Sequence, residues 1–94
     1  MLPRQRRVPG YKVKQLLSAP VVKRTGGLTI KAATNGLTYS RFAVVVPKKA
    51  TPKAVTRNRL KRQMMASIQA NITDYETGKD YLFLIYEIFG FKID

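Results

Sequence analysis

All five acidic side chains of this sequence lie after residue 73, although basic side chains are spread along its whole length. Eighteen Lys and Arg stand against five Asp and Glu, so the formal net charge is +13. Residues 1–73 carry no acid, and this segment therefore cannot neutralise itself with internal ion pairs. Its counter-charge is expected to come from a partner. A polyanion is the commonest such partner, with nucleic acid ahead of an anionic membrane surface.

Length and composition restrict the chain to one small domain. Its 94 residues include 45% hydrophobic and 24% charged side chains, which is typical of a folded domain with a modest core. We predict one domain over 1–94, in which residues 1–9 form a basic arm. Since there is no Cys and no His, disulfides, zinc fingers and Cys or His catalysis are excluded. No apolar run is long enough to span a membrane, and the basic start lacks a signal-peptide core, so we expect a cytoplasmic protein.

The first half of the chain predicts a short helix and a hairpin. Apolar spacing indicates a helix over 11–18, which ends before Pro20. Alternating residues over 28–33 predict a strand, and Asn35-Gly36 is typical of a tight turn. A second strand over 39–46 is expected to return beside the first. Its Phe42, Val44 and Val46 share one face.

The second half predicts a long helix and a buried strand. Thr51-Pro52 is typical of a helix start, with the hydroxyl as a cap, and the helix is expected to run to about Ile72. Leu60, Met64, Ile68 and Ile72 recur at every fourth position, which predicts a core stripe. The run 81–86 is apolar on both faces, as in a strand that is covered on both sides. Strand, helix and strand then form a crossover beside the hairpin, whereas the tail 88–93 is too short to assign.

Seven cations crowd into fifteen residues, from the end of the second strand through the first turns of the long helix. At about 100° per residue they surround most of the helix, so its start should project beyond the sheet. Free N–H groups and the helix dipole favour phosphate at such an end. No carboxylate stands at i+4 to relieve the repulsion, which favours RNA or DNA binding over a merely solvated face. The seven are Lys48, Lys49, Lys53, Arg57, Arg59, Lys61 and Arg62.

Other interpretations of the same features stay open. Tyr11, Tyr39 and Phe42 can stack on unpaired bases, although core packing explains each more simply. Helix-turn-helix DNA binding is disfavoured because no helix precedes the basic one across a short turn. A membrane-surface peptide is disfavoured because the basic helix lacks a wide bulky apolar face. A basic ribosomal protein or RNA chaperone has the same composition and remains the main alternative.

Two strings in the sequence resemble the signature of the bacterial ribonuclease P protein component, and so does the opening MLP. They are RFAVVVPKK at 41–49 and KAVTRNRLKR at 53–62. The resemblance implies an α/β (α+β) sandwich with a small mixed sheet, a short N-terminal helix and a left-handed crossover, against the usual hand. It also implies an accessory subunit of an endoribonuclease that matures the 5′ end of tRNA. The partners would be ribonuclease P RNA and the precursor-tRNA 5′ leader, and the RNA would carry out catalysis with Mg²⁺. No catalytic or metal-binding side chain is expected in the protein.

The resemblance also assigns RNA contacts residue by residue. Arg41 matches the Arg that opens the family's strand, and supports either RNA binding or the fold. Asn58 is either an RNA contact or a capping or buried hydrogen-bond residue, since Asn inside a helix often bonds locally. The expected RNA contacts are Lys48, Lys49, Lys53, Arg57, Asn58, Arg59, Lys61 and Arg62, together with Arg41.

Departures from the family pattern fall where it lines the leader-binding cleft. Met65 stands where the family usually has Arg, and Val13, Leu17 and Lys31 stand at positions that are often aromatic. We therefore expect leader recognition to be weaker, or to depend more on charge than on stacking. The family also continues into a C-terminal helix after its last strand, where this sequence has only a short tail.

Overall fold

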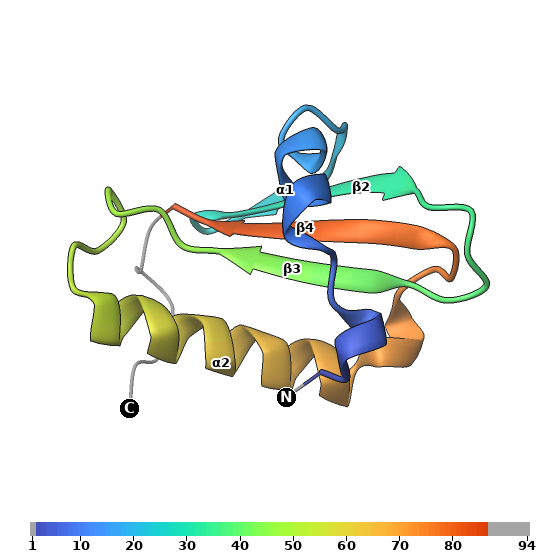
Figure 1. The fold of residues 1–94 in the computed structure, drawn as a ribbon. Helices are drawn as coiled ribbons and strands as arrows, with labels where there is room; N and C mark the ends of the chain where they lie inside the picture. Colours follow the sequence, from blue (N-terminus) through green and yellow to red (C-terminus); the bar gives the residue numbers. More distant parts are fainter. Residues whose placement is uncertain (1, 87–94) are drawn as a thin grey trace.

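A four-stranded mixed sheet with one helix on each face forms the centre of the computed structural model, which describes residues 2–86 (Figure 1). The short helix α1 lies above the sheet in that view, and the long helix α2 lies below it. In chain order the elements are η1 (Arg4–Arg6), α1 (Gly10–Leu16), β1 (Val21–Thr25), β2 (Leu28–Thr34), β3 (Arg41–Val45), α2 (Ala54–Ala70), η2 (Ile72–Asp74) and β4 (Lys79–Ile85).

The predicted hairpin between the strands over 28–33 and 39–46 is wrong. The strand order is β1-β2-β4-β3, so β4 lies between the two strands that were expected to pair. The hairpin is instead β1–β2, which turns at Gly26 and Gly27, both with positive φ. Asn35 explains why the other turn stays open: its amide nitrogen donates to Tyr39 O at 3.2 Å and to Asp80 Oδ1 at 2.9 Å. These bonds hold the chain in a wider loop that makes room for β4.

The predicted crossover is confirmed. β3 and β4 are parallel neighbours, with Phe42 opposite Tyr81, and α2 connects them along one face. The strand expected over 81–86 is β4, which is buried from Asp80 to Ile85. The hand of the crossover stays a prediction of the family resemblance. The tail 88–93, and the question of a C-terminal helix, lie outside the described residues.

The predicted helix start is wrong by two residues. α2 begins at Ala54, its N-cap is Lys53, and no side chain caps it. Thr51 lies two residues before this N-cap; it is buried, and its carbonyl accepts a hydrogen bond from Arg57. The helix ends at Ala70 rather than near Ile72, which instead begins η2. The first helix, expected over 11–18, is confirmed as α1.

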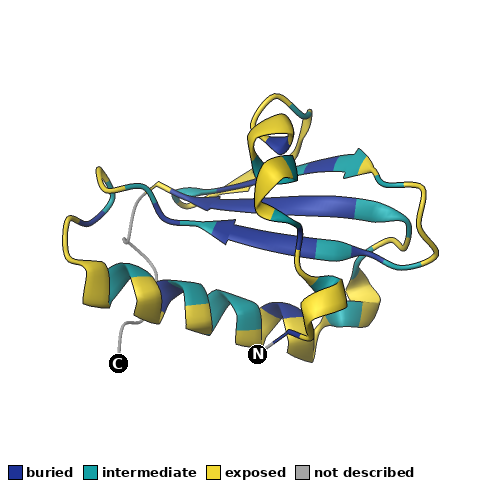
Figure 2. Cartoon of the chain, in the orientation of Figure 1, coloured by how far each residue is buried: buried dark blue, intermediate teal, exposed yellow. Residues whose placement is uncertain are grey.

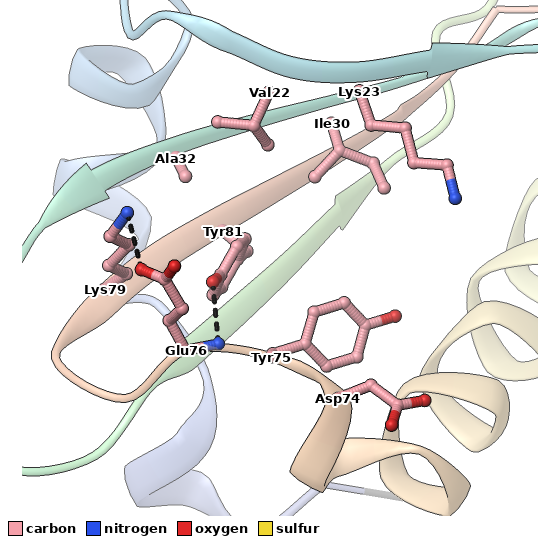
Figure 3. Close-up of a pocket in the computed structure, with 9 residues that line it drawn as sticks. All are labelled: Val22, Lys23, Ile30, Ala32, Asp74, Tyr75, Glu76, Lys79 and Tyr81. Carbon is pink, nitrogen blue, oxygen red and sulfur yellow. Dashed lines mark hydrogen bonds and ion pairs between the residues drawn. The ribbon is translucent and has the colours of Figure 1, made fainter.

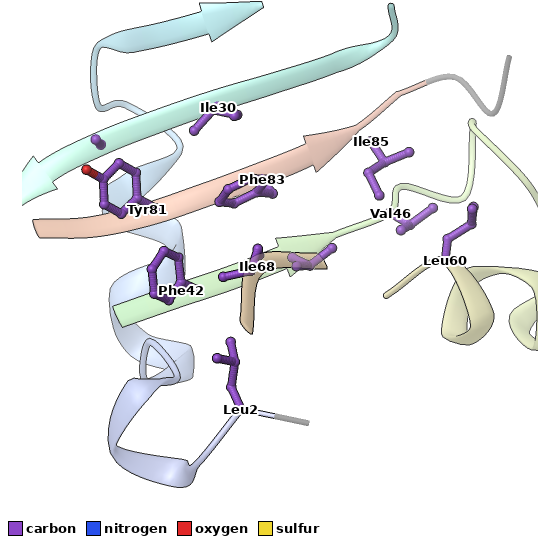
Figure 4. Close-up of a cluster of buried hydrophobic side chains, with 11 residues drawn as sticks. Leu2, Ile30, Phe42, Val46, Leu60, Ile68, Tyr81, Phe83 and Ile85 are labelled. Atoms are coloured by element: carbon purple, nitrogen blue, oxygen red, sulfur yellow. The ribbon is translucent and has the colours of Figure 1, made fainter. Parts of the chain in front are cut away.

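The main core lies between the sheet and α2 (Figure 4). Leu60 and Ile68 of α2 are fully buried there, which confirms the predicted stripe. Phe42 stacks on Tyr81 with ring centres 5.5 Å apart, and Leu2 of the arm closes the same core. A smaller cluster beneath α1 covers the other face and contains Val8, Leu16, Ala43, Leu82 and Leu84. Burial on both faces explains why β4 is almost wholly buried (Figure 2).

Candidate nucleic-acid interface

The basic segment lies at the end of the molecule where β3 finishes. The β3–α2 loop and the first turns of α2 extend beyond the end of β3, as predicted (Figure 1). The loop lysines Lys48 and Lys49 are exposed, as is Lys53 at the N-cap of α2. Ala50 N donates to Pro47 O at 3.0 Å, which closes a turn within this loop. Three amines are thus presented to solvent from one loop.

A small groove gathers part of the basic helix. Asn58, Lys61 and Arg62 line a cavity of about 200 Å³ together with Met65 and with Arg7 of the N-terminal arm. Asn58 is exposed, which contradicts the alternative that it is a buried hydrogen-bond residue. Arg59 is exposed and lies outside the groove. The cations on α2 therefore lie on two sides of the helix. Lys61 and Arg62 face the arm, and Arg59 lies outside the groove.

Arg57 has a structural contact that the sequence did not suggest. Its Nη1 donates to Thr51 O at 3.0 Å and to Pro52 O at 2.7 Å. Both carbonyls belong to the turn that leads into α2, so the guanidinium closes this loop from inside the helix. A guanidinium has further N–H groups that can still meet phosphate. A substitution at Arg57 therefore changes both the loop and the charge.

Arg41 forms a two-point ion pair with Asp80. Its Nε donates to Oδ1 at 2.8 Å and its Nη2 donates to Oδ2 at 2.7 Å, and the two side chains are 13% and 3% exposed. The pair joins the first residue of β3 to β4, which gives Arg41 the fold-supporting role considered above. Its contact with RNA stays a prediction.

The charge state of Asp80 follows from the same contacts. Burial raises the pKa of this carboxyl, but hydrogen bonds from Arg41 and Asn35 and the charges of Arg41 and Lys12 outweigh burial. The pKa of Asp80 therefore lies below its ordinary value, and the carboxylate stays ionised beside its partners.

A second cavity has a different lining (Figure 3). It holds about 450 Å³ between the β1–β2 side of the sheet and the segment after η2. Asp74 and Glu76 stand at its rim, where Glu76 pairs with Lys79 at 2.9 Å. Burial, followed by the charge of Asp74, raises the pKa of Tyr75. Its two carboxylates offset its two lysines, Lys23 and Lys79, so this cavity has no excess of positive charge, and the basic end remains the candidate interface.

Two other kinds of feature are absent from the described residues. Residues 2–86 hold no group of three or more acidic, His or Cys side chains placed to bind a metal ion. No helix among the described elements is long and apolar enough to cross a membrane.

Comparison with known proteins identifies the family. The family model described as Ribonuclease P matches residues 12–89, which is most of the chain. The chain belongs to the Ribonuclease P family. The matched segment includes both strings quoted above, so the groove residues of α2 belong to the part that this Ribonuclease P family protein shares with its relatives.

The relatives are longer than this Ribonuclease P family chain. The proteins named ribonuclease P protein component from Pseudomonas putida and Pseudomonas entomophila are each 42% identical to it over 59 residues. Those residues are 62% of this chain and 44% of each relative. The matched part of the chain thus spans less than half the length of these curated relatives.

Solved structures support the fold of this Ribonuclease P family chain. The structure of the RNase P protein from Thermotoga maritima matches with a TM-score of 0.75 at 23% identity, over 85% of this chain and 73% of that one. The structure of the same protein in complex with 1-(4-fluorophenyl)-2-thiourea gives a TM-score of 0.71 at 26% identity, over 90% and 75%. The mixed sheet with two helices is therefore the fold of these proteins.

The positions where this Ribonuclease P family chain departs from the family pattern are now placed. Val13 packs in the cluster beneath α1, whereas Leu17 is 45% exposed just after that helix. Lys31 Nζ donates to Leu17 O, which ties β2 to the end of α1. Met65 packs against the main core and lines the groove. A lysine thus bridges β2 and the end of α1 from a position that is often aromatic in the family.

Of the three candidate stacking rings, the structure leaves one fully available. Phe42 is completely buried, which confirms core packing for that residue. The Arg6 guanidinium lies 5.9 Å from the centre of the Tyr39 ring, so Tyr39 already has a cationic partner. Tyr11 on α1 is 73% exposed.

Arg7 was not among the residues predicted from the sequence, because its place beside α2 depends on the path of the arm.

Proposed function

We propose that this protein is the protein component of ribonuclease P and promotes 5′ maturation of precursor tRNA. It would bind ribonuclease P RNA through the basic end of the molecule and help this RNA to hold the precursor 5′ leader. The observation that carries the proposal is the family's basic string on a helix that extends beyond the sheet, with Lys61 and Arg62 free to meet phosphate. The proposal includes a cytoplasmic location, where these RNA partners would be met.

The side chains of the protein favour an accessory role over a catalytic one. The sequence has no His and no Cys, so the usual protein nucleophiles and imidazole acid–base groups are missing. Cations that line a groove can lower the repulsion between two RNA strands, which otherwise requires bound metal ions. We therefore propose that the RNA carries out catalysis with Mg²⁺, and that the protein lowers the Mg²⁺ concentration that the reaction needs.

The test is maturation of a precursor tRNA by ribonuclease P RNA from the same source at low Mg²⁺, with and without the protein. The variant is Lys61→Ala with Arg62→Ala, because neither side chain forms an ion pair within residues 2–86. Arg57 is a poorer choice since it closes a loop. The matched control is Lys23→Ala with Arg24→Ala, which removes the same charge from the exposed edge strand β1.

Rescue of cleavage by the wild type and by the control, lost in the Lys61 and Arg62 variant, supports the proposal. Tight RNA binding without any rescue of cleavage contradicts it and favours a basic ribosomal protein or RNA chaperone. Equal loss in both double variants would mean that net charge, rather than this site, is responsible.

A further inference from the structure

The strand β1 leaves one edge of the sheet without a partner among the described residues. It pairs with β2 alone, and all five of its residues, Val21–Thr25, are exposed. The opposite edge differs, because the N-terminal arm pairs with β3 through the bridge from Arg7 to Phe42. The outward backbone N–H and C=O groups of β1 can therefore pair with a further strand.

An irregular register in β1 directs two consecutive side chains to one cavity. The register shifts between Val21 and Lys23, which is the pattern of a β-bulge. Neighbouring residues of a regular strand point to opposite faces, whereas Val22 and Lys23 both line the cavity of about 450 Å³ (Figure 3). The free edge and this cavity are therefore parts of one surface.

The cavity has an apolar and aromatic wall that is already in place. Ile30 and Ala32 of β2 line it with Tyr81 of β4 and with Tyr75 (Figure 3). The rings of Tyr75 and Tyr81 pack edge to face with their centres 5.4 Å apart, and Tyr81 Oη accepts a hydrogen bond from Glu76 N at 3.0 Å. These contacts hold the segment after η2 against the sheet, so the cavity can receive a large apolar side chain without rearrangement.

The charge along β1 indicates which kind of partner fits. Lys23 and Arg24 are neighbours on this strand, and neither forms an ion pair within residues 2–86. A second copy of this chain would bring like charges together across the new ladder, so the two cations oppose self-association through the edge. An RNA strand can meet the cations but has no peptide groups for the edge. An acidic extended peptide supplies both the carboxylates and the peptide groups.

We infer that β1 and the adjoining cavity bind an extended, acidic segment of a protein partner, which adds a strand to the sheet. The backbone of this segment pairs with β1, and one large apolar side chain enters the cavity beside Val22. Its carboxylates meet Lys23 and Arg24. This surface shares no residue with the β3–α2 loop or with α2, so the inference goes beyond the proposed function and does not depend on it.

A synthetic peptide of defined composition tests the backbone pairing. The probe is a fluorescent hexapeptide with blocked ends, in which three acidic residues alternate with two valines and one phenylalanine. Fluorescence anisotropy measures its affinity, and amide NMR spectra of the protein show where it binds. Two further forms carry N-methyl groups, one form on the odd and the other on the even positions. Alternate N–H groups of a strand point to opposite sides, so only one of these forms loses its bonds to β1.

Protein variants test the side chains of the surface. Val22→Asp places a carboxylate at the cavity, and Val55→Asp is the matched control, because Val55 is an exposed valine of α2. Lys23→Glu reverses a charge of the edge, and Lys61→Glu makes the same change on α2. Thermal unfolding shows whether each variant keeps its fold. The N-methylated peptides test the unaltered protein in any case.

We expect one N-methylated form to bind like the parent peptide and the other to bind roughly tenfold more weakly, since it loses backbone hydrogen bonds. Val22→Asp and Lys23→Glu should each weaken binding roughly tenfold, whereas both α2 variants should stay within about twofold. A peptide with lysines in place of its acids should bind far more weakly. The bound acidic peptide should slow hydrogen exchange at the amides of β1.

Results with the peptides can overturn the inference. It is wrong if the acidic peptide does not bind at concentrations up to about 1 mM, the range of weak complexes. Equal affinity of the two N-methylated forms would show that no strand is added. Equal affinity of the acidic and the basic peptide would show that charge does not select the partner.

Other occupants of the edge give different results. If a short single-stranded RNA shifts the β1 amides and the peptide does not, the edge belongs to an RNA surface and the inference is wrong. Slow exchange at β1 without peptide would mean that the edge is already covered. A second copy covers it if the slowing increases with protein concentration, and the chain itself covers it if the slowing does not. None of these measurements involves precursor tRNA, so failure here leaves the proposed function standing.

Discussion

Asp80 combines burial with three hydrogen bonds at the start of the central strand. Its carboxylate accepts two from Arg41 and one from Asn35, so it links β3, β4 and the loop between β2 and β3. Removal of one partner of such a pair leaves the other charge without compensation. Because its carboxylate is hydrogen-bonded to two other segments of the chain, Asp80 contributes to the fold rather than to a binding surface.

We predict that Asp80→Asn lowers the free energy of unfolding at neutral pH by about 2 kcal/mol, below the range for fully buried pairs because water reaches part of Arg41. The pKa of Asp80 is lowered in the folded state, so its stabilisation is complete above the ordinary value of 3.8 and is lost as pH falls through the lower folded value. Urea unfolding of both proteins between about pH 7 and about pH 2 measures the effect. The gap between them should close in acid, and a gap that is constant with pH would contradict this role.

At the scale of elements, the turns decide how the strands connect. Gly78 precedes β4 with φ +76, and a Cβ there would lie 3.2 Å from Leu37 O. Gly36 has nearly the same φ, +74, but a Cβ there would meet nothing within 4 Å. A substitution at Gly36 therefore tests backbone strain alone, whereas one at Gly78 tests backbone strain together with steric crowding.

We predict that Gly36→Ala costs about 1 kcal/mol of stability, because an L side chain is strained in the left-handed region. Gly78→Ala should cost about 2 kcal/mol or more, because the loop carbonyl must also move away. Denaturant unfolding of both variants gives the two values. Equal costs would show that the contact with Leu37 O relaxes freely.

Elements with a strong periodic pattern were predictable from the sequence. The stripe through Leu60 and Ile68 indicated the long helix, and the alternation of Phe42, Val44 and Val46 indicated the face of β3 that meets it. Local rules were sufficient there because each pattern reports burial of one face. The basic string was equally visible, since charge does not need the fold to be recognised.

Pairing between strands was beyond local rules. The fully exposed β1 has no alternation of apolar and polar residues, and no local signal showed that β4 would separate β2 from β3. The dipeptide Asn35-Gly36 favours a tight turn, but the hydrogen bond from Asn35 to the distant Asp80 overrides that preference. Arg7 was missed for the same reason, because only the packed arm brings it to α2.

At the scale of the whole molecule, cations are concentrated in the β3–α2 loop and along α2, whereas exposed carboxylates among the described residues lie past the end of that helix. The loop lysines precede α2 and the groove residues lie in its middle turns, while Asp74 and Glu76 follow its last residue. Such a separation of charge orients a protein on a polyanion before any contact is made. Affinity for RNA should therefore be governed by phosphate neutralisation.

We predict a steep dependence of RNA affinity on salt. If about five phosphates are neutralised, affinity should fall by roughly four orders of magnitude over a tenfold rise in salt, from the slope of counterion release. Binding isotherms with ribonuclease P RNA at fixed Mg²⁺ and varied monovalent salt measure the slope. A nearly flat response would contradict a phosphate-based interface.

The position of β4 has a consequence for the synthesis of this protein. β4 is the last of the described elements to leave the ribosome, yet it occupies the centre of the sheet between β2 and β3. Until it emerges, β3 has only the single bridge from Arg7 to Phe42 as a backbone partner, and the face that α2 covers lacks Tyr81, Phe83 and Ile85. Folding is thus a late and cooperative event that depends on contacts distant in sequence. The nascent chain therefore exposes its entire polycationic segment beside ribosomal RNA while that segment is still unfolded.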